Sequence, residues 1–384
     1  MRTDIQRFRW MTARLPDQTT HRLVVLTGAR QTGKTTTARQ RYAGLRYVNL
    51  DNLEEREALS TLRTAAWGAT VGDAIVDEAQ KAPTTFDKVK WAFDEGHIRF
   101  SVLLGSSRLL LMQRIRETLA GRAFVYDLWP LMASELRHAG DERPAWPLLH
   151  ALLEGSAPFD DVLGDQPPAL MASDDEGRQA ASDHLAGWGG MPALLPLSDP
   201  DRREWLRSYQ QTFLERDLID LARLPDFDPF RALQHLCMLR TGNLLSYSDL
   251  ARDAGLSPST ARRYVEYLKA SYQVVLLPPF SENLTSTLVK APKLYWVDLG
   301  LLRQGTRQWG PLTGALFESL VVGEIQKWVS TLGLDARLFF YRTRSGMEVD
   351  LVIDTVHGVI GVEVKSRPAA VPTDARGLVA LAHA

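Results

Sequence analysis

The sequence predicts an α/β protein: a parallel sheet covered by helices, then a helical middle region, then a second and smaller α/β domain. Two observations carry this prediction. Short apolar segments that read as strands alternate with helical segments in the first third of the chain, which favours a parallel sheet. A glycine-rich loop that ends in Gly-Lys-Thr follows the first of these strands and opens a helix.

Five strands are expected in this first part, at 21–27, 45–51, 71–78, 99–107 and 122–131. Each is short and largely apolar, and the segments between them have helical character. We therefore expect helices on both faces of the sheet.

After about residue 136 the chain becomes rich in Pro, Asp and Gly, which predicts a lid or linker with loops up to about residue 200. A helix is expected at 202–224, and about four helices and a strand at 229–280. In the latter segment Ser257 and Pro258 are suited to begin the second helix of a winged helix-turn-helix.

The last part should contain a helix at 314–330 and strands at 337–343, 347–354 and 358–365. The resulting predicted domains are a sheet domain at 1–135, a helical lid or linker at 136–228, a winged helix-turn-helix at 229–290 and a C-terminal α/β domain at 291–384.

Composition narrows the class of protein. The chain has 384 residues, of which 45% are hydrophobic and 24% charged, as in ordinary globular proteins. No apolar run approaches the ~18 residues that span a bilayer, and no secretory signal is recognisable. The single cysteine, Cys237, excludes a disulfide framework and a cysteine-rich zinc site. We expect a cytoplasmic protein without a membrane partner.

The net charge of −1 argues against a protein that coats nucleic acid over its whole surface. The charge is unevenly distributed, however: residues 151–230 carry about −10, whereas residues 1–150 and 231–310 carry about +5 each. A polyanion such as DNA would bind to the two basic segments.

Residues 28–35, GARQTGKT, fit the pattern G-x-x-x-x-G-K-[ST] between a strand and a helix. This predicts a phosphate loop for ATP: backbone N–H groups surround the phosphates, Lys34 bridges the β and γ phosphates, and the Thr35 hydroxyl binds Mg²⁺. The alternative is a chance glycine-rich turn. The expected ATP-binding residues are Gly28, Ala29, Arg30, Gln31, Thr32, Gly33, Lys34, Thr35 and Thr36.

An apolar strand ends in the acids Asp77 and Glu78. Beside a phosphate loop, Asp77 can hold the Mg²⁺ shell and Glu78 can polarise the attacking water; otherwise they are an ordinary strand-end pair. The next strand ends near Ser106, whose hydroxyl would orient that water unless it belongs to a simple turn. Arg122 is the first candidate for a further cation, in cis or from a neighbouring subunit, and surface charge is the alternative.

These motifs resemble those of AAA-type ATPases that carry a C-terminal "domain of unknown function 4143". The resemblance extends over GARQTGKTT, YVNLD, IVDEAQKAP, LLGSS and LAGRAFVYDLWPL, then GGMP, ERDL, APKLYWVDLGLL, FESLVV, YRTRSGMEVDLVI and GVEVKS. It spans nearly the whole chain. It implies an ATP-binding and ATP-hydrolysing enzyme that uses Mg²⁺, and we expect it to form a homo-oligomer.

The C-terminal part contains Asp350 and, 13 residues later, Glu363-Val364-Lys365. In a strand, Glu363 and Lys365 share a face, and a hairpin would bring Asp350 beside them. Glu318 lies on the apolar side of a preceding helix, where a buried carboxylate needs a partner. This arrangement resembles the PD-(D/E)xK nuclease fold, which implies a metal site formed by Glu318, Asp350 and Glu363, with Lys365 beside it.

The pattern is short enough to arise by chance, and the fold could serve only to bind. The chain ends at Ala384, about nineteen residues after Lys365 and inside a predicted helix. We therefore expect a nuclease-like domain that is truncated at its C-terminus, which disfavours cleavage.

Two functions remain open on the sequence. The first is an ATPase that acts on DNA as a motor or nuclease-associated enzyme, with Thr260, Arg262, Arg263 and Lys269 of the winged helix facing the DNA. The second is a nucleotide-dependent switch that binds a protein partner, in which those arginines instead pair with the acidic segment 151–230.

Overall fold

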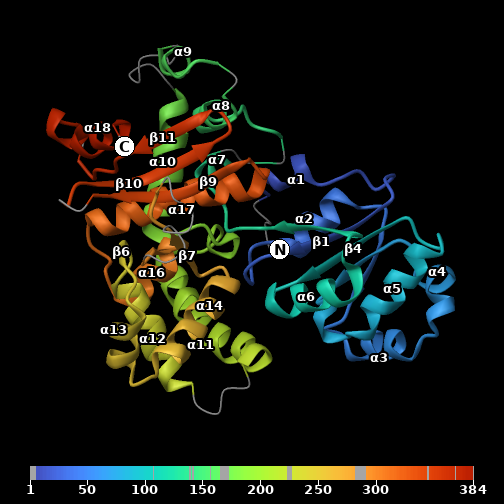
Figure 1. Cartoon of the computed structure of the whole chain (residues 1–384). Coiled ribbons are helices and arrows are strands. Elements are labelled where there is room, and N and C mark those ends of the chain that lie inside the picture. The colour runs from blue at the N-terminus through green and yellow to red at the C-terminus, as the bar shows by residue number, and fades with distance from the viewer. Residues whose placement is uncertain are drawn as a thin grey trace.

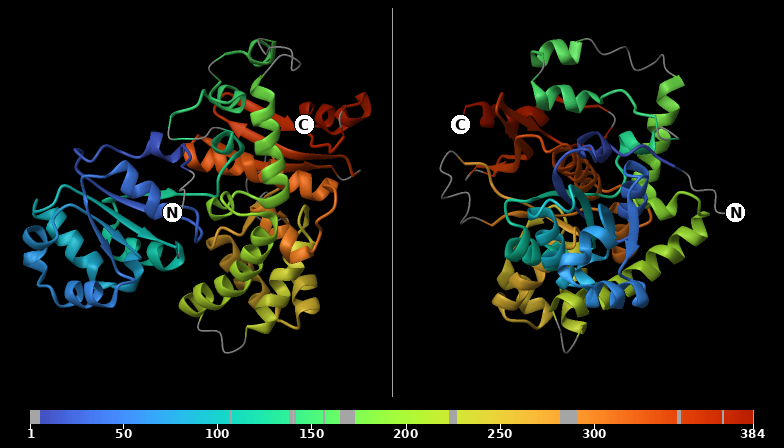
Figure 2. Two further views of the ribbon diagram at one scale, coloured as in Figure 1. Left: turned by 180° about the vertical axis from the view of Figure 1, so that it is seen from behind. Right: turned by 90° about the vertical axis from the view of Figure 1, so that its right-hand side faces the viewer.

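The computed structural model describes residues 6–106, 108–137, 140, 142–155, 157–164, 173–222, 227–281, 291–343, 346–367 and 369–383. The chain forms two lobes that lie side by side (Figures 1 and 2). The N-terminal sheet and its helices make up one lobe, and all later elements pack together in the other. None of the described helices is long and apolar enough to span a membrane.

The first lobe is built on a five-stranded parallel sheet of order β2-β3-β4-β1-β5, which confirms the predicted α/β fold. Its strands are β1 (Arg22–Thr27), β2 (Arg46–Asn49), β3 (Ala74–Asp77), β4 (Phe100–Gly105) and β5 (Ala123–Asp127). Thr27 at the end of β1 is in register with Gly105 of β4 and with Asp127 of β5. The carboxyl ends of these strands therefore form one edge.

Helices cover both faces of this sheet. The side chains of each strand alternate in direction, so one strand contributes to a buried cluster on each face. Leu23 and Val25 of β1 pack into one buried cluster, and Val24 and Leu26 pack into another. The helices of this lobe are α1 (Met11–Arg14), α2 (Lys34–Arg41), α3 (Leu53–Thr61), α4 (Trp67–Thr70), α5 (Thr84–Asp94) and α6 (Arg108–Arg114), the last followed by a π-helical turn at Ile115–Leu119.

The middle of the chain is helical, with α7 (Ala133–Leu136), α8 (Leu148–Glu154), α9 (Phe159–Gly164), α10 (Ser173–Trp188) and α11 (Asp199–Ala222). Part of the expected loop region, residues 165–172, lies outside the described residues. The turn between α10 and α11 is tightly packed: a Cβ on Gly190 would lie 2.3 Å from the Leu131 carbonyl oxygen, and Asp298 accepts a hydrogen bond from the Gly190 nitrogen at 2.8 Å.

The segment expected to hold about four helices contains three: α12 (Asp228–Leu239), α13 (Tyr247–Ala254) and α14 (Pro258–Ala270). Strand β6 (Asn243–Leu244) replaces helix after α12, and β7 (Val274–Leu277) and β8 (Lys293–Trp296) complete an antiparallel sheet of order β6-β8-β7. The Ser257 side chain caps α14, and Pro258 is its first residue, as expected.

The C-terminal part contains α16 (Leu299–Thr306), α17 (Gly314–Leu332), β9 (Ala336–Arg342), β10 (Glu348–Thr355), β11 (Gly358–Val362) and α18 (Arg376–Ala382). Strands β11, β10 and β9 form an antiparallel sheet. The expected third strand is shorter than predicted, because β11 ends at Val362. The Val364 nitrogen then donates to the Asp350 side chain at 2.8 Å instead of continuing the strand ladder.

Candidate functional site

The glycine-rich loop follows β1 and opens α2, at the carboxyl edge of the parallel sheet. Its glycines are required by space and conformation. A Cβ on Gly28 would lie 2.1 Å from the carbonyl oxygen of Leu128, and Gly33 has a φ of 91°. Gln31 also adopts a left-handed conformation, with a φ of 63°. The loop therefore turns tightly against the end of β5, because Gly28 and Gly33 have no side chains that would prevent the close approach or the turn.

The Lys34 ammonium lies inside this loop. The side chain is buried, and Nζ donates to the carbonyl oxygens of Gly28 at 3.0 Å and of Ala29 at 2.8 Å. Thr32 reinforces the turn, because its hydroxyl donates to the Ala29 carbonyl at 2.9 Å. The loop thus holds a positive charge at the N-terminus of a helix, where phosphate groups bind readily.

Asp77 at the end of β3 meets the start of α2. Its Oδ2 accepts hydrogen bonds from Thr35 Oγ1 at 2.6 Å and from the Tyr47 hydroxyl at 2.8 Å, and its Oδ1 accepts from the Glu78 nitrogen at 2.9 Å. A hydroxyl and a carboxylate held this close form the hard oxygen donor set that Mg²⁺ prefers. These two residues fit the metal role predicted for them.

Glu78 and Ser106 follow β3 and β4, which are neighbours in the sheet. Glu78 has a left-handed backbone with a φ of 52°, and its carboxylate accepts from the Gln80 amide. Ser106 is buried, and its hydroxyl has no hydrogen-bond partner among the described residues. Both therefore lie at the edge that carries the phosphate loop, as the predicted roles require.

The expected position of Arg122 on the nucleotide side of the sheet is wrong. Arg122 precedes β5, and Ala123 is in register with Leu23 near the start of β1. In a parallel sheet this is the edge opposite the phosphate loop. Its guanidinium instead pairs with Asp94 at 2.6 and 3.0 Å. Arg108 does lie at the carboxyl edge, 3.4 Å from Asp127.

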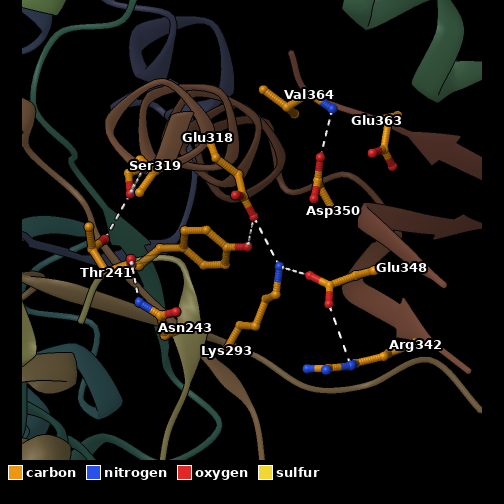
Figure 3. Close-up of polar contacts among 12 residues, drawn as sticks. Thr241, Asn243, Lys293, Glu318, Ser319, Arg342, Glu348, Asp350, Glu363 and Val364 are labelled. Carbon is orange, nitrogen blue, oxygen red and sulfur yellow. Dashed lines mark hydrogen bonds and ion pairs between the residues drawn. The ribbon is translucent and has the colours of Figure 1, made fainter. Parts of the chain in front are cut away.

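The C-terminal carboxylates form a second polar cluster between α17, β8 and β10. Figure 3 shows the Lys293 ammonium between Glu318 and Glu348. Lys293 is only 4% exposed; its Nζ lies 3.1 Å from Glu318 Oε1 and also contacts Glu348. The Tyr295 hydroxyl donates to the same Glu318 carboxylate. The half-buried Glu318 carboxylate thus has a lysine and a tyrosine as partners, where the sequence suggested a metal.

Asp350, Glu363 and Lys365 lie together at the end of the β10–β11 pair, as predicted. Leu351 is in register with Val362, which places Asp350 across from Glu363. The Lys365 ammonium contacts Glu363 and lies 3.7 Å from Asp350. Burial raises the pKa of Glu363, and the neighbouring Asp350 charge adds to the increase.

Burial likewise raises the pKa of Glu318. Within the described ranges, no group of three or more His, Cys, Asp or Glu side chains is arranged to hold a metal ion. Glu318 therefore belongs to the Lys293 cluster, and the predicted triad with Asp350 and Glu363 is not assembled as a metal-binding group.

Among the contacts to the phosphate loop that escaped the sequence reasoning, two come from Arg9 and Tyr272. The buried Arg9 guanidinium donates to the carbonyl oxygens of Thr32 at 2.8 Å and Trp129 at 2.6 Å. It therefore links the phosphate loop to the segment that follows β5. Tyr272, which follows α14, contacts the strand ends beside the loop. No sequence pattern marks either, because each reaches the loop only through the tertiary fold.

The second helix of the helix-turn-helix exposes the basic side chains that were predicted. Arg262, Arg263 and Lys269 are exposed on α14, and neither arginine forms an ion pair with a described residue. Arg262 stacks on Tyr247 at 4.6 Å and Arg263 lies near Tyr264 at 5.8 Å.

Comparisons with known proteins agree with this organisation. A family model described as an AAA domain matches residues 20–137, one for domain of unknown function 8612 matches 180–308, and one for domain of unknown function 4143 matches 313–384. Uncharacterized proteins of Mycobacterium bovis and Mycobacterium tuberculosis are each 28% identical over 356 residues, which cover 89% of this chain and 70% of theirs.

The solved structures that match the chain include a Walker-type ATPase of Pyrococcus abyssi, with a TM-score of 0.45. Its sequence is 15% identical, and the match covers 77% of this chain and 94% of that one. The ORC2 protein of Aeropyrum pernix in its ADP form has a TM-score of 0.27 and 14% identity over 67% and 81% of the two chains. The AAA model and the model for domain of unknown function 4143 match in one chain and in the predicted order, so the chain carries an AAA domain followed by a C-terminal domain of unknown function 4143.

Proposed function

We propose that the protein binds Mg–ATP at the phosphate loop, hydrolyses it, and couples the hydrolysis to work on DNA. The observation that carries the ATPase part is the junction of Thr35 and Asp77, 2.6 Å apart, beside the buried Lys34 ammonium. A tight glycine-rich loop and two oxygen donors of the kind that Mg²⁺ prefers lie there at one edge of the sheet, which supports a Mg–ATP site.

Each residue has a distinct role in the proposed reaction. Lys34 would turn from the loop carbonyls to the β and γ phosphates, and Thr35 and Asp77 would hold the Mg²⁺, which would neutralise phosphate charge. Glu78 accepts a proton from the attacking water, whose oxygen bonds to the γ phosphorus as the bond to the β–γ bridging oxygen breaks. The Ser106 hydroxyl, which has no hydrogen-bond partner within the described part of the chain, would orient that water.

The DNA part of the proposal rests on the helix-turn-helix. The order α12, β6, α13, α14, β7, β8, with β8 between β6 and β7, is that of a winged helix. In a helix-turn-helix formed by α13 and α14, the second helix, here α14, enters the major groove. Arg262 and Arg263 are exposed on that helix and are not neutralised by the acidic segment 151–230 among the described residues, which favours DNA over internal pairing.

The decisive experiment measures ATP turnover and salt-dependent DNA affinity with duplex, branched and single-stranded DNA. We expect DNA to raise turnover, and Lys34→Ala to abolish it. The double variant R262A/R263A should weaken DNA binding and flatten its salt dependence, because fewer counterions are released. The matched control R203A/R207A removes two exposed arginines from α11 and should leave DNA affinity unchanged. Unaltered affinity in R262A/R263A would reject the DNA role of α14.

A second function is favoured by the Lys293 cluster. There Glu318 and Glu348 already have an internal cation, so the C-terminal domain would dock a protein partner in a nucleotide-dependent manner instead of cleaving DNA. Cleavage of supercoiled DNA with Mg²⁺ or Mn²⁺, lost in Asp350→Asn, would contradict this alternative. Absence of cleavage by wild-type protein that still hydrolyses ATP would favour it.

A further inference from the structure

The phosphate loop is contacted from outside the AAA domain by Tyr272, a residue of the helix-turn-helix region. Tyr272 follows α14 and precedes β7 in the chain, and its side chain is buried at 3% exposure. The family model for the AAA domain ends at residue 137. A side chain from the second lobe therefore contributes to the surroundings of the loop.

The Tyr272 hydroxyl joins the ends of two strands. It donates to Asp127 Oδ1 at the end of β5 at 2.7 Å and is hydrogen-bonded to the Thr27 hydroxyl at the end of β1 at 3.2 Å. Thr27 immediately precedes Gly28, the first residue of the loop. A displacement of this hydroxyl would therefore act on the point at which the phosphate loop leaves the sheet.

The ring of Tyr272 packs against the loop itself. It shares a buried apolar cluster with Ala29 of the loop, Trp129 and Val297, and meets the Trp129 ring edge-on with centroids 5.1 Å apart. The Arg108 guanidinium, which lies 3.4 Å from Asp127, is 5.7 Å from the centre of the same ring. Apolar contacts and a nearby cation thus fix the position of the Tyr272 ring.

The backbone of Tyr272 is unusual. Its φ is 63°, in the left-handed region that a bulky residue avoids. Such a conformation persists only where surrounding contacts determine it, and it often lies where a side chain must be directed to a site. Here it ends α14: the Tyr272 nitrogen donates to the Lys269 carbonyl at 3.1 Å and the Gln273 nitrogen donates to the Leu268 carbonyl at 2.9 Å, as in a left-handed helix cap.

We propose that Tyr272 is a positioning residue that couples the helix-turn-helix to the phosphate loop. Nucleotide binding at the loop and the docking of α14 and β7 against the AAA domain then stabilise each other, because coupling between two sites is reciprocal. This inference rests on the proposed binding of Mg–ATP to the loop.

Tyr272→Phe is the test variant, since it removes the hydroxyl and retains the packed ring. We expect it to weaken Mg–ATP binding in the full chain by about five-fold or more, the lower end of measured couplings between sites, in titration calorimetry. Hydrogen exchange supplies the reciprocal readout: Mg–ATP should slow exchange of residues 258–277 in wild-type protein and slow it less in the variant.

Tyr42→Phe is the matched control. It also removes a buried tyrosine hydroxyl, which donates to the Pro16 carbonyl at 2.9 Å at the far end of α2. It should lower thermal stability without changing nucleotide affinity or the exchange of residues 258–277. Should Tyr272→Phe fail to fold, Thr27→Val removes the other hydroxyl of the pair with little change of shape.

The outcomes separate the two proposals. If wild-type protein does not bind Mg–ATP, the proposed function fails and this inference with it. If wild-type protein binds but Tyr272→Phe (or Thr27→Val in its place) shows the same affinity and the same exchange, the inference alone is overturned. Equal effects of Tyr42→Phe and Tyr272→Phe would also overturn it, because they would reflect general destabilisation.

Discussion

The hydroxyl of Thr35 lies 2.6 Å from Asp77 Oδ2, although the two residues are 42 positions apart in the chain. The parallel sheet creates this contact, because it places the end of β3 beside the helix that follows the phosphate loop. The contact joins the two halves of the proposed Mg²⁺ site.

Thr35→Ala should lower Mg²⁺-dependent ATP turnover by about 100-fold, because it removes one oxygen ligand for the metal. Thr35→Ser retains the hydroxyl and should remain within a few-fold of wild type. A Mg²⁺ titration of turnover measures both. Equal activity of the alanine and serine variants would exclude the Thr35 hydroxyl as a ligand.

Glu78→Gln should keep ATP binding and lose turnover by ~100-fold or more, the usual scale for a general base. The amide has the shape of the carboxylate but cannot accept the proton of water. Binding is measured by calorimetry and turnover by phosphate release, with the exposed Glu54→Gln as the matched control. Normal turnover would move the catalytic role to another residue, and Ser106→Ala would then be tested.

Arg122 lies at the edge of the sheet opposite its own phosphate loop, so a catalytic role for it requires the phosphate loop of a neighbouring subunit. Arg122→Ala should therefore lower turnover only at concentrations where the chain assembles, and mixing it with Lys34→Ala should restore some activity. Arg108→Ala should lower turnover at every concentration. A monomeric mass in the assay, together with a concentration-independent loss in Arg122→Ala, would contradict the trans role.

Lys293→Met should reduce the free energy of unfolding by about 3 kcal/mol, because two partly buried carboxylates lose their shared ammonium partner. Adding Glu318→Gln should recover part of this loss. Lys81→Met, which removes a more exposed pair with Asp51, should cost about 1 kcal/mol or less. Chemical denaturation of the three variants measures these free energies of unfolding. A loss in Lys293→Met that is no larger than in the control would mean that the Lys293 cluster contributes little to stability.

His184 should make stability fall as pH decreases from about 6.5 to 4. Burial lowers the pKa of His184 to about 4 in the folded chain, and the nearby Arg202 and Arg7 lower it further, while Asp199 opposes them. The unfolded chain then binds a proton that the folded chain does not, with a slope of up to about 1.4 kcal/mol per pH unit.

His184→Phe should flatten this part of the pH profile, measured by denaturation at several pH values. Carboxylates titrate in the same range in both proteins, so the difference between the two profiles is the readout. The exposed His235→Phe serves as the control and should keep the wild-type slope. Superimposable profiles for His184→Phe and wild type would contradict the assignment.

Local patterns in the sequence determined the parallel sheet, the phosphate loop, the capped start of α14 and the proximity of Asp350 to Glu363. Each of these depends on residues near in sequence or on the alternation of a strand. The third C-terminal strand is shorter than the sequence predicts. The Asp350 side chain accepts a hydrogen bond from the Val364 nitrogen, which would otherwise have continued the strand ladder.

Only the tertiary structure decided the partners of charged side chains. Glu318 meets Lys293 and Tyr295, Arg122 meets Asp94, and Tyr272 reaches Thr27 across 245 positions of the chain. A sequence marks which side chains carry charge or hydroxyl groups, but a buried carboxylate or hydroxyl is satisfied by whichever donor the packing of distant elements brings within hydrogen-bonding distance.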